Sequence, residues 1–199
     1  MRNAIHHPAS ALVGPALAAL GGLTYGSWAV ALMILVSMML AWTSWRAAAA
    51  AGGVARITLV SLGGLAAGLA LVQFIPYGHD HVNPPVTAEP AWDTAETRAL
   101  AVRACFDCHS NETVWPWYAD LAPLSWLTTN HVIEGRETLN FSTWDRAQGE
   151  TEEIGETIVE GEMPPAYFTV LHSQARLSAA EKQRLIDGLE ATVAASPPG

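Results

Sequence analysis

The sequence predicts an all-α fold in which N-terminal transmembrane helices precede a helical, water-exposed domain. Half of the 199 residues are hydrophobic and only 15% are charged, yet all 19 acidic residues lie at or after Asp80. Two long apolar runs precede that point. Beyond it, apolar residues recur at spacings of three and four behind helix-capping residues, which is the pattern of amphipathic helices.

The apolar runs predict two membrane spans, at about residues 26–45 and 57–75, each near the length that a crossing requires. Trp28, Trp42 and Trp45 lie near the ends of the first run, where indole rings favour the membrane interface. A shorter apolar segment at 9–23 is a possible third segment, either interfacial or spanning. We therefore divide the chain into an anchor at 1–76, a proline-rich extended linker at 77–91 and a helical domain at 92–199.

The positions of the few basic residues predict the orientation of the anchor. Arg46 and Arg56 flank the connector between the two runs. Because arginine and lysine are enriched in cytoplasmic loops, the connector is expected in the cytoplasm. The chain after the second span is then extracytoplasmic.

The C-terminal part is strongly acidic. Seven basic residues against 19 acidic ones leave a net charge of −12 after the second span. Such a surface disfavours nucleic acid, whose phosphates need basic partners, and it suits a partner with a positive docking face. A purely solubilising role for this charge is the alternative.

The chemistry-bearing motif is C-x-x-C-H at Cys105, Cys108 and His109, the attachment signature of a c-type haem. Two cysteines three residues apart share one helical face and can bond to the two vinyl groups of one porphyrin. His109 can then be the proximal iron ligand. These are the only two cysteines, so a second attachment site is excluded. Zinc held by both cysteines and two histidines remains an alternative, as does a redox dithiol, although no βαβ pattern accompanies the motif.

A sixth iron ligand is expected from Met163, the only methionine after the apolar runs. Two prolines follow it and would hold its loop stiff. A thioether is a soft, neutral ligand that favours ferrous haem. His131, predicted to face inward, is the alternative sixth ligand, with His172 behind it.

The helices of this domain are predicted from their caps and spacing. One begins at Asp93 or Thr94 and carries the cysteines, a second covers about 123–139, and a third covers about 151–160. Ser178 and Glu181 form a capping box for the last helix, which should pack across the first. Leu124, Leu127, Thr128, His131 and Gly135 are expected to form the inner stripe of the second helix. The aromatic segment 115–118 is suited either to walling a porphyrin or to an ordinary core.

This order of elements resembles the class I c-type cytochromes. Five blocks more closely resemble a bacterial family of membrane-anchored haem-binding domain proteins: CFDCHSNET at 105–113, PWY at 116–118, APLSW at 122–126, HVIEGRETLNF at 131–141 and GEMP at 161–164. The resemblance covers about 73–189. It implies one haem c on Cys105 and Cys108, with His109 and Met163 as ligands and His131 either near the haem or in a buried hydrogen bond. It also implies the bacterial inner membrane, with the haem domain on the periplasmic side. Members commonly have a single anchor, so the second span is a departure.

Three functions follow from these predictions. The first is one-electron transfer by a membrane-anchored mono-haem cytochrome with a redox protein partner. The second is a haem enzyme or a sensor of gas or redox state with an open or displaceable sixth ligand, in which His131 and Arg136 act on the bound molecule. The third is a subunit of a larger respiratory or photosynthetic membrane complex, which is compatible with the first.

Overall fold

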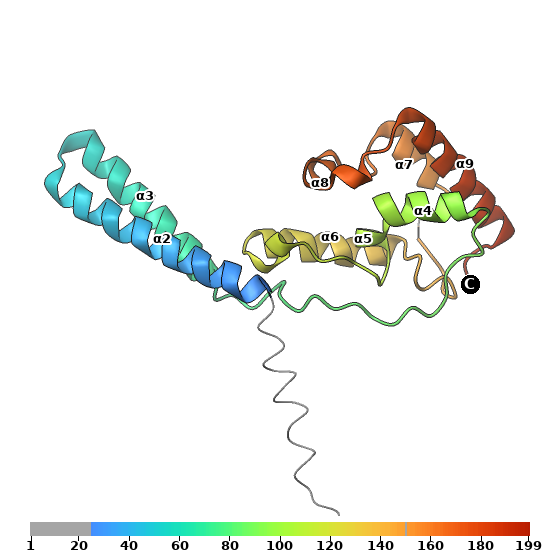
Figure 1. Ribbon diagram of the computed structural model, residues 1–199, viewed down its shortest axis with the longest axis horizontal. Coiled ribbons are helices and arrows are strands. Elements are labelled where there is room, and N and C mark those ends of the chain that lie inside the picture. Colours follow the sequence, from blue (N-terminus) through green and yellow to red (C-terminus); the bar gives the residue numbers. More distant parts are fainter. Residues whose placement is uncertain (1–24, 150) are drawn as a thin grey trace, which may run out of the picture. The chain divides into compact units, whose positions relative to one another are not determined.

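The computed structural model describes residues 25–149 and 151–199. Over these residues the chain is helical, and its only β contact is an isolated bridge between Ala88 and Thr143. The predicted all-α class is therefore confirmed. The elements are α2 (Tyr25–Ala50), α3 (Gly53–Val72), α4 (Ala95–Ala104), α5 (Phe106–His109), η2 (Trp117–Asp120), α6 (Leu124–Thr138), α7 (Ile154–Glu160), α8 (Ala166–Leu171), η3 (Ser173–Ala175) and α9 (Ala179–Ala195) (Figure 1). The segment at 9–23 lies outside the described residues.

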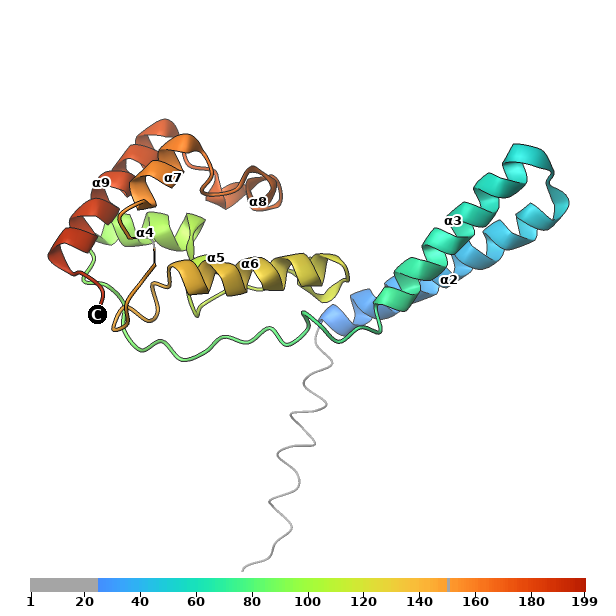
Figure 2. The ribbon, with the colours of Figure 1, turned by 180° about the vertical axis from the view of Figure 1, so that it is seen from behind.

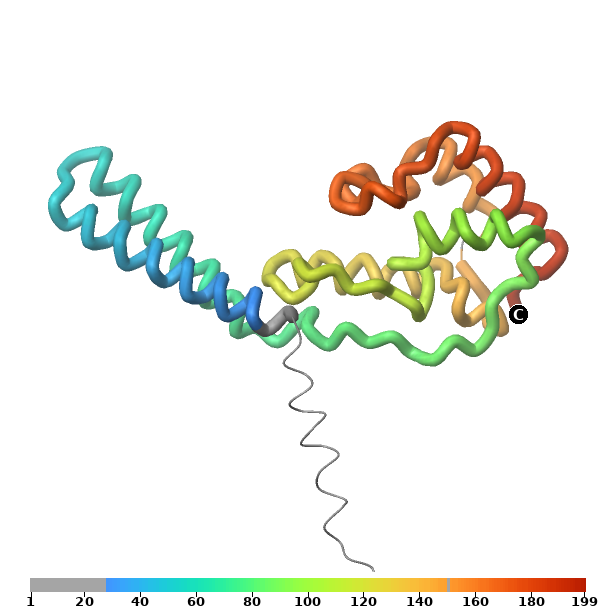
Figure 3. Tube along the Cα trace, viewed as in Figure 1, coloured from blue at the N-terminus to red at the C-terminus, as the bar shows by residue number. Residues whose placement is uncertain are grey.

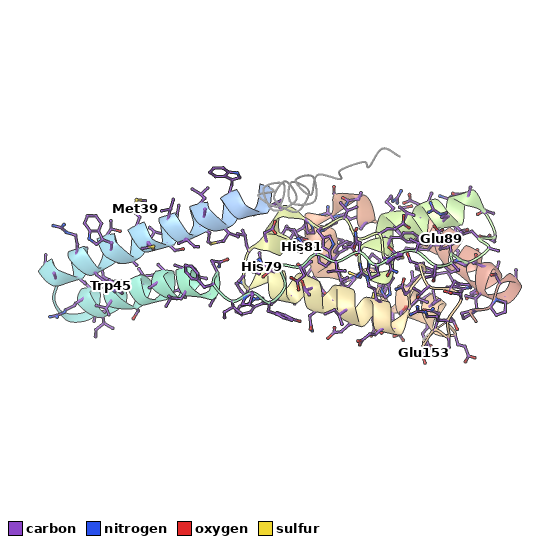
Figure 4. All side chains as sticks on the ribbon, turned by 90° about the horizontal axis from the view of Figure 1, so that it is seen from below. Met39, Trp45, His79, His81, Glu89 and Glu153 are labelled. Carbon is purple, nitrogen blue, oxygen red and sulfur yellow. The ribbon has the colours of Figure 1, made fainter. Side chains whose placement is uncertain are left out.

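The two apolar runs form a helical hairpin of α2 and α3 (Figure 2). The segments Trp28–Ala50 and Gly53–Val72 are long and apolar enough to cross a membrane. Gly63 permits the close contact between the helices, because a Cβ atom there would lie 2.6 Å from Trp45 Nε1. Large apolar side chains on the outer faces are exposed, among them Trp28, Leu32, Leu35, Met38, Met39, Leu65 and Leu71. Figure 4 labels Met39 and Trp45 on α2.

The connector between these helices is shorter than predicted. The sequence suggested a loop over about 47–54, whereas α2 continues to Ala50 and α3 begins at Gly53. Alanine has the highest helix propensity of all residues, so the run of five alanines extends α2 by more than a turn. Only Ala51 and Gly52 remain as the turn.

The chain divides into two compact units. Residues 25–79 and 116–126 form the described part of the first unit, and residues 80–115 and 127–199 form the second. Gln73 joins the two segments of the first unit. Its Oε1 atom accepts from the Ala122 N–H at 3.0 Å, and its Nε2 atom donates to the Ala122 carbonyl at 2.8 Å.

The second unit is built on two crossing helices, α4 and α9 (Figure 3). Thr94 caps α4 by accepting from the Thr97 N–H at 3.1 Å. Ser178 and Glu181 form the predicted capping box of α9. The predicted packing of the last helix across the first is confirmed, and it depends on Gly188, whose missing side chain leaves room for Thr97.

The core of this unit is aromatic on one side and aliphatic on the other. Phe106 stacks on Phe141 at 5.6 Å between ring centroids, and Phe141 stacks on Trp144 at 5.9 Å. The buried aliphatic members are Leu100, Leu139, Ile154, Ile158, Leu185, Ile186 and Leu189. The core thus joins α4 and α5 to α7 and α9 around the C-x-x-C-H segment.

The proline-rich segment before α4 is extended, as predicted for a linker, but it also forms hydrogen bonds with the second unit. The N–H groups of Thr87 and Ala88 both donate to the Ser142 carbonyl, at 2.9 and 3.3 Å. Trp144 N–H donates back to the Ala88 carbonyl at 3.0 Å. Glu89, labelled in Figure 4, forms an ion pair with Arg98 of α4 at 2.7 Å.

We expect Gly188→Ala to lower the free energy of unfolding by about 1–3 kcal/mol, because a methyl group there would collide with the buried Thr97 side chain. Thermal or denaturant unfolding of the full chain in detergent, followed by circular dichroism, measures this. Gly155→Ala is the matched control, since its methyl group meets chiefly the flexible end of the Glu190 side chain. Equal effects of the two substitutions would contradict the proposed role of the crossing.

Candidate cofactor site

The C-x-x-C-H segment forms a tight turn at the end of α4. Cys105 N–H donates to the Ala101 carbonyl at 2.8 Å and closes α4, while its carbonyl accepts from the N–H groups of Cys108 and His109 at 3.1 and 2.9 Å. Phe106 is buried in the core and anchors the turn. The motif's cysteines are therefore presented together from one short, fixed piece of backbone.

Both cysteines are thiols outside any disulfide. Burial raises the pKa of Cys105 to about 12 and that of Cys108 to about 11, so both are protonated at neutral pH. A thiol S–H is the group that adds across a vinyl bond. No group of three or more His, Cys, Asp or Glu side chains placed to hold a metal occurs within residues 25–149 and 151–199.

His109 is oriented by a hydrogen bond from its ring to the backbone of Leu139, the residue that directly follows α6. Its Nδ1 atom lies 3.0 Å from the Leu139 carbonyl oxygen. Because a carbonyl can only accept, Nδ1 carries the proton and the lone pair resides on Nε2. This tautomer is the one that binds a metal through Nε2, with the second ring nitrogen held by the protein.

The haem-attachment motif and both leading candidates for the sixth ligand line one cavity of about 400 Å³. They are Cys105, Cys108, His109, His131 and Met163. Much of the remaining wall is apolar, with Ala104, Leu139, Phe141, Ile154, Ile158, Pro164, Pro165, Phe168, Leu185 and Leu189. The volume lies in the usual range for a small-molecule or cofactor site. An apolar pocket with two thiols, one oriented imidazole and one thioether fits a covalently bound haem.

Met163 is positioned by the end of α7. Gly161 adopts φ = 81° and ends the helix, and the N–H groups of Glu162 and Met163 both donate to the Thr157 carbonyl, at 3.0 and 3.1 Å. With the Gly161 N–H donating to Ile158, this is a Schellman motif. The Met163 side chain is 37% exposed. The loop thus brings the thioether to the cavity wall with its backbone fixed.

His131 lines the cavity in contact with Tyr167, a residue that the sequence reasoning did not single out. Tyr167 Oη lies 3.2 Å from His131 Nε2, and the two rings stack with centroids 5.2 Å apart. Tyr167 is on α8, three residues after the first of the two prolines. Its place beside the Met-Pro-Pro segment is the one signal that could have identified it.

Two of the residue sets that the sequence offered for the cofactor site lie elsewhere. His172 does not line the cavity: it is buried, stacks on Phe168 at 4.0 Å and lies 3.8 Å from Asp107 Oδ2. The aromatic segment 115–118 does not wall the cavity either; Trp115 stacks on His81, and the remainder belongs to the first unit. Phe141 and Phe168 supply aromatic wall instead.

Arg136 also lies outside the cavity wall and donates to backbone and side-chain oxygens instead. It donates to the carbonyls of Ser110 at 2.7 Å and Val82 at 2.9 Å, and to Asn83 Oδ1 and Thr113 Oγ1, each at 2.9 Å. The charge-stabilising role considered for it at a bound molecule is therefore not supported. Its place is structural: it joins α6 to the residues that directly follow the C-x-x-C-H motif.

The inner face of α6 differs from the predicted stripe. Leu124 and Leu127 are exposed, at 43% and 50%, whereas Val132 and Leu139 are buried. Gly135 is the closest contact of this helix with the motif, because a Cβ atom there would lie 2.6 Å from the Cys108 carbonyl oxygen. A glycine in the middle of a helix was the sequence signal for this contact.

In a comparison with protein families, residues 67–191, which are more than half of the chain, match the family described as "Haem-binding domain". No curated protein and no solved structure matches the chain significantly.

We expect Gly135→Ala to reduce the fraction of chains that carry covalent haem, because its methyl group would push α6 away from the Cys108 backbone and disturb the His109–Leu139 contact. Haem staining after denaturing electrophoresis measures this fraction. Gly64→Ala on α3 is the control, since nothing lies within 4 Å of that position. Undiminished attachment in the Gly135 variant would contradict the importance of the contact.

Proposed function

Because the chain belongs to the haem-binding domain family, we propose that it is a membrane-anchored mono-haem c-type cytochrome that transfers single electrons. The observation that carries the proposal is the shared cavity of Cys105, Cys108, His109 and Met163. When bound there, haem supplies an iron that alternates between ferric and ferrous states. The thiols of Cys105 and Cys108 would hold it as thioethers.

The axial residues suit electron transfer. His109, with its proton fixed on Nδ1, would bind iron through Nε2. Met163 would fill the second axial position, and two filled positions leave no site for a substrate. The largely apolar wall excludes water, which reduces the solvent rearrangement that accompanies a change in charge. The protein's task in this proposal is to fix the ligands and the surroundings of the iron.

The hairpin of α2 and α3 would anchor the domain in the bacterial inner membrane. Its exposed apolar side chains are costly in water and stable in lipid. Arg46 and Arg56 lie on either side of the short turn between the helices, which favours a cytoplasmic turn. The haem domain would then lie on the periplasmic side, where an acidic surface suits a redox protein with a basic docking face, free or within a larger respiratory or photosynthetic complex.

An optical spectrum of the purified protein, oxidised and reduced, tests the electron-transfer proposal. We expect a pyridine haemochrome typical of haem with two thioethers, an iron–methionine charge-transfer band, and no change on adding carbon monoxide to the reduced protein. Rapid carbon monoxide binding would instead favour a haem enzyme or sensor with an open sixth position. Absence of haem would overturn both.

We expect Met163→Ala to leave haem attached but to lower the midpoint potential by on the order of 100 mV, because the thioether favours the ferrous state. Redox titration followed optically measures the change, and carbon monoxide should then bind. Met39→Ala, in the hairpin, is the control methionine and should change neither property. A wild-type potential and spectrum in the Met163 variant would show that another residue is the ligand.

A further inference from the structure

The polar side chains that line the cavity differ in whether their hydrogen-bond donors are already used within the protein. A bound haem carries two propionate carboxylates at the edge opposite its vinyl groups, and carboxylates removed from water need hydrogen-bond donors. No lysine or arginine lines the cavity. The side chains that could donate are the hydroxyls of Thr138 and Thr157, together with His131 and Tyr167.

The hydroxyls of the two threonines already donate to backbone carbonyls of their own helices. Thr138 Oγ1 donates to the Glu134 carbonyl at 2.9 Å, and Thr157 Oγ1 donates to the Ile154 carbonyl at 3.1 Å. The remaining polar wall consists of the Glu134 and Glu153 carboxylates, which accept hydrogen bonds when ionised and repel another carboxylate. Only the pair of His131 and Tyr167 has donors that are not bonded to backbone.

His131 is on α6 and Tyr167 on α8, whereas Cys105 and Cys108 are at and just after the end of α4; Figures 1 and 2 show these helices. Tyr167 is 56% exposed, so the pair lies where the cavity meets solvent. The thioether bonds would fix the vinyl edge of haem at the cysteines. The propionates are charged, so they would lie at the solvent-facing rim of the cavity, where Tyr167 is exposed.

The phenol of Tyr167 packs over the face of the His131 ring. Its Oη atom lies 3.2 Å from Nε2 and 3.4 Å from Nδ1, and the two rings are stacked, so the imidazole fixes the position of the phenol. Burial, with the nearby Cys108 and Glu134, raises the pKa of Tyr167, so the phenol keeps its proton at physiological pH. The pair therefore presents one positioned hydroxyl donor at the cavity rim.

We propose that Tyr167, oriented by His131, donates a hydrogen bond to a propionate of the haem bound in this cavity. The inference rests on the proposed haem function and deepens it. It makes Tyr167 a cofactor-binding residue and His131 a positioning residue. The inference takes Met163, and not His131, as the second axial ligand of the iron.

The test compares Tyr167→Phe with the wild type in the full-length, haem-loaded protein in detergent. We expect the propionate bending mode in the resonance Raman spectrum to shift. We also expect the equilibrium constant for reduction to fall about threefold to tenfold, which is about 30–60 mV at ~59 mV per tenfold. The direction follows because a carboxylate that loses a donor concentrates negative charge and favours ferric iron. Thr138→Val, which removes a hydroxyl bonded to backbone, should change neither quantity.

Three results would overturn the inference while leaving the haem function intact. One is an unchanged Raman mode and potential in Tyr167→Phe with haem attached. Another is an equal change in Thr138→Val, which would indicate a general effect of cavity polarity. The third is a change of His131→Gln from a low-spin to a high-spin spectrum, which would make His131 an iron ligand. A wild-type protein without covalent haem would instead overturn the proposed function itself.

Discussion

The contact between α6 and the C-x-x-C-H turn is the constraint on which the site depends. The missing side chain of Gly135 lets the helix meet the Cys108 backbone, and one turn later the Leu139 carbonyl accepts the His109 Nδ1 proton. The same helix presents His131 to the cavity. A shift of α6 would therefore disturb the His109 hydrogen bond, the contact with the Cys108 backbone and the position of His131 together, because all three depend on this helix and on the residue that directly follows it.

A second set of bonds fixes α6 from its outer side. Arg136 spans from the helix to Ser110, directly after the motif, and to Val82 and Asn83, before α4. Asn83 Nδ2 in turn donates to the Thr113 carbonyl at 2.9 Å. The segment that leads from the apolar hairpin is thereby part of the scaffold that positions His109. Burial lowers the pKa of Arg136, but four hydrogen bonds offset the cost of removing the guanidinium from water.

The sequence predicted what is encoded locally. The all-α class, the cap at Thr94, the capping box at Ser178 and the end of α7 at Gly161 depend on residues within one or two turns. The predictions from sequence failed where contacts between residues far apart in the chain determine the structure. In the sequence, Tyr167 is an ordinary aromatic residue, and only its contact with His131 of α6 shows that it lines the cavity. Arg136 was expected to act on a bound molecule, but its hydrogen bonds to Val82 and Asn83 show that it holds the segment before α4. The exposed Leu124 and Leu127 show the same limit: helical periodicity identifies a stripe, but not which neighbour covers it.

The composition of the cavity also bears on the reduction potential that the proposed haem would have. A methionine ligand and apolar walls favour the ferrous state, since both disfavour additional positive charge on the iron. Glu134 and Glu153 act in the opposite direction, because carboxylates within the wall stabilise the ferric charge. Asn130 donates to Glu134 Oε1 at 2.8 Å and so holds one of these charges in place. The potential is therefore set by opposing contributions from different helices, which leaves it adjustable without any change to Cys105, Cys108 or His109.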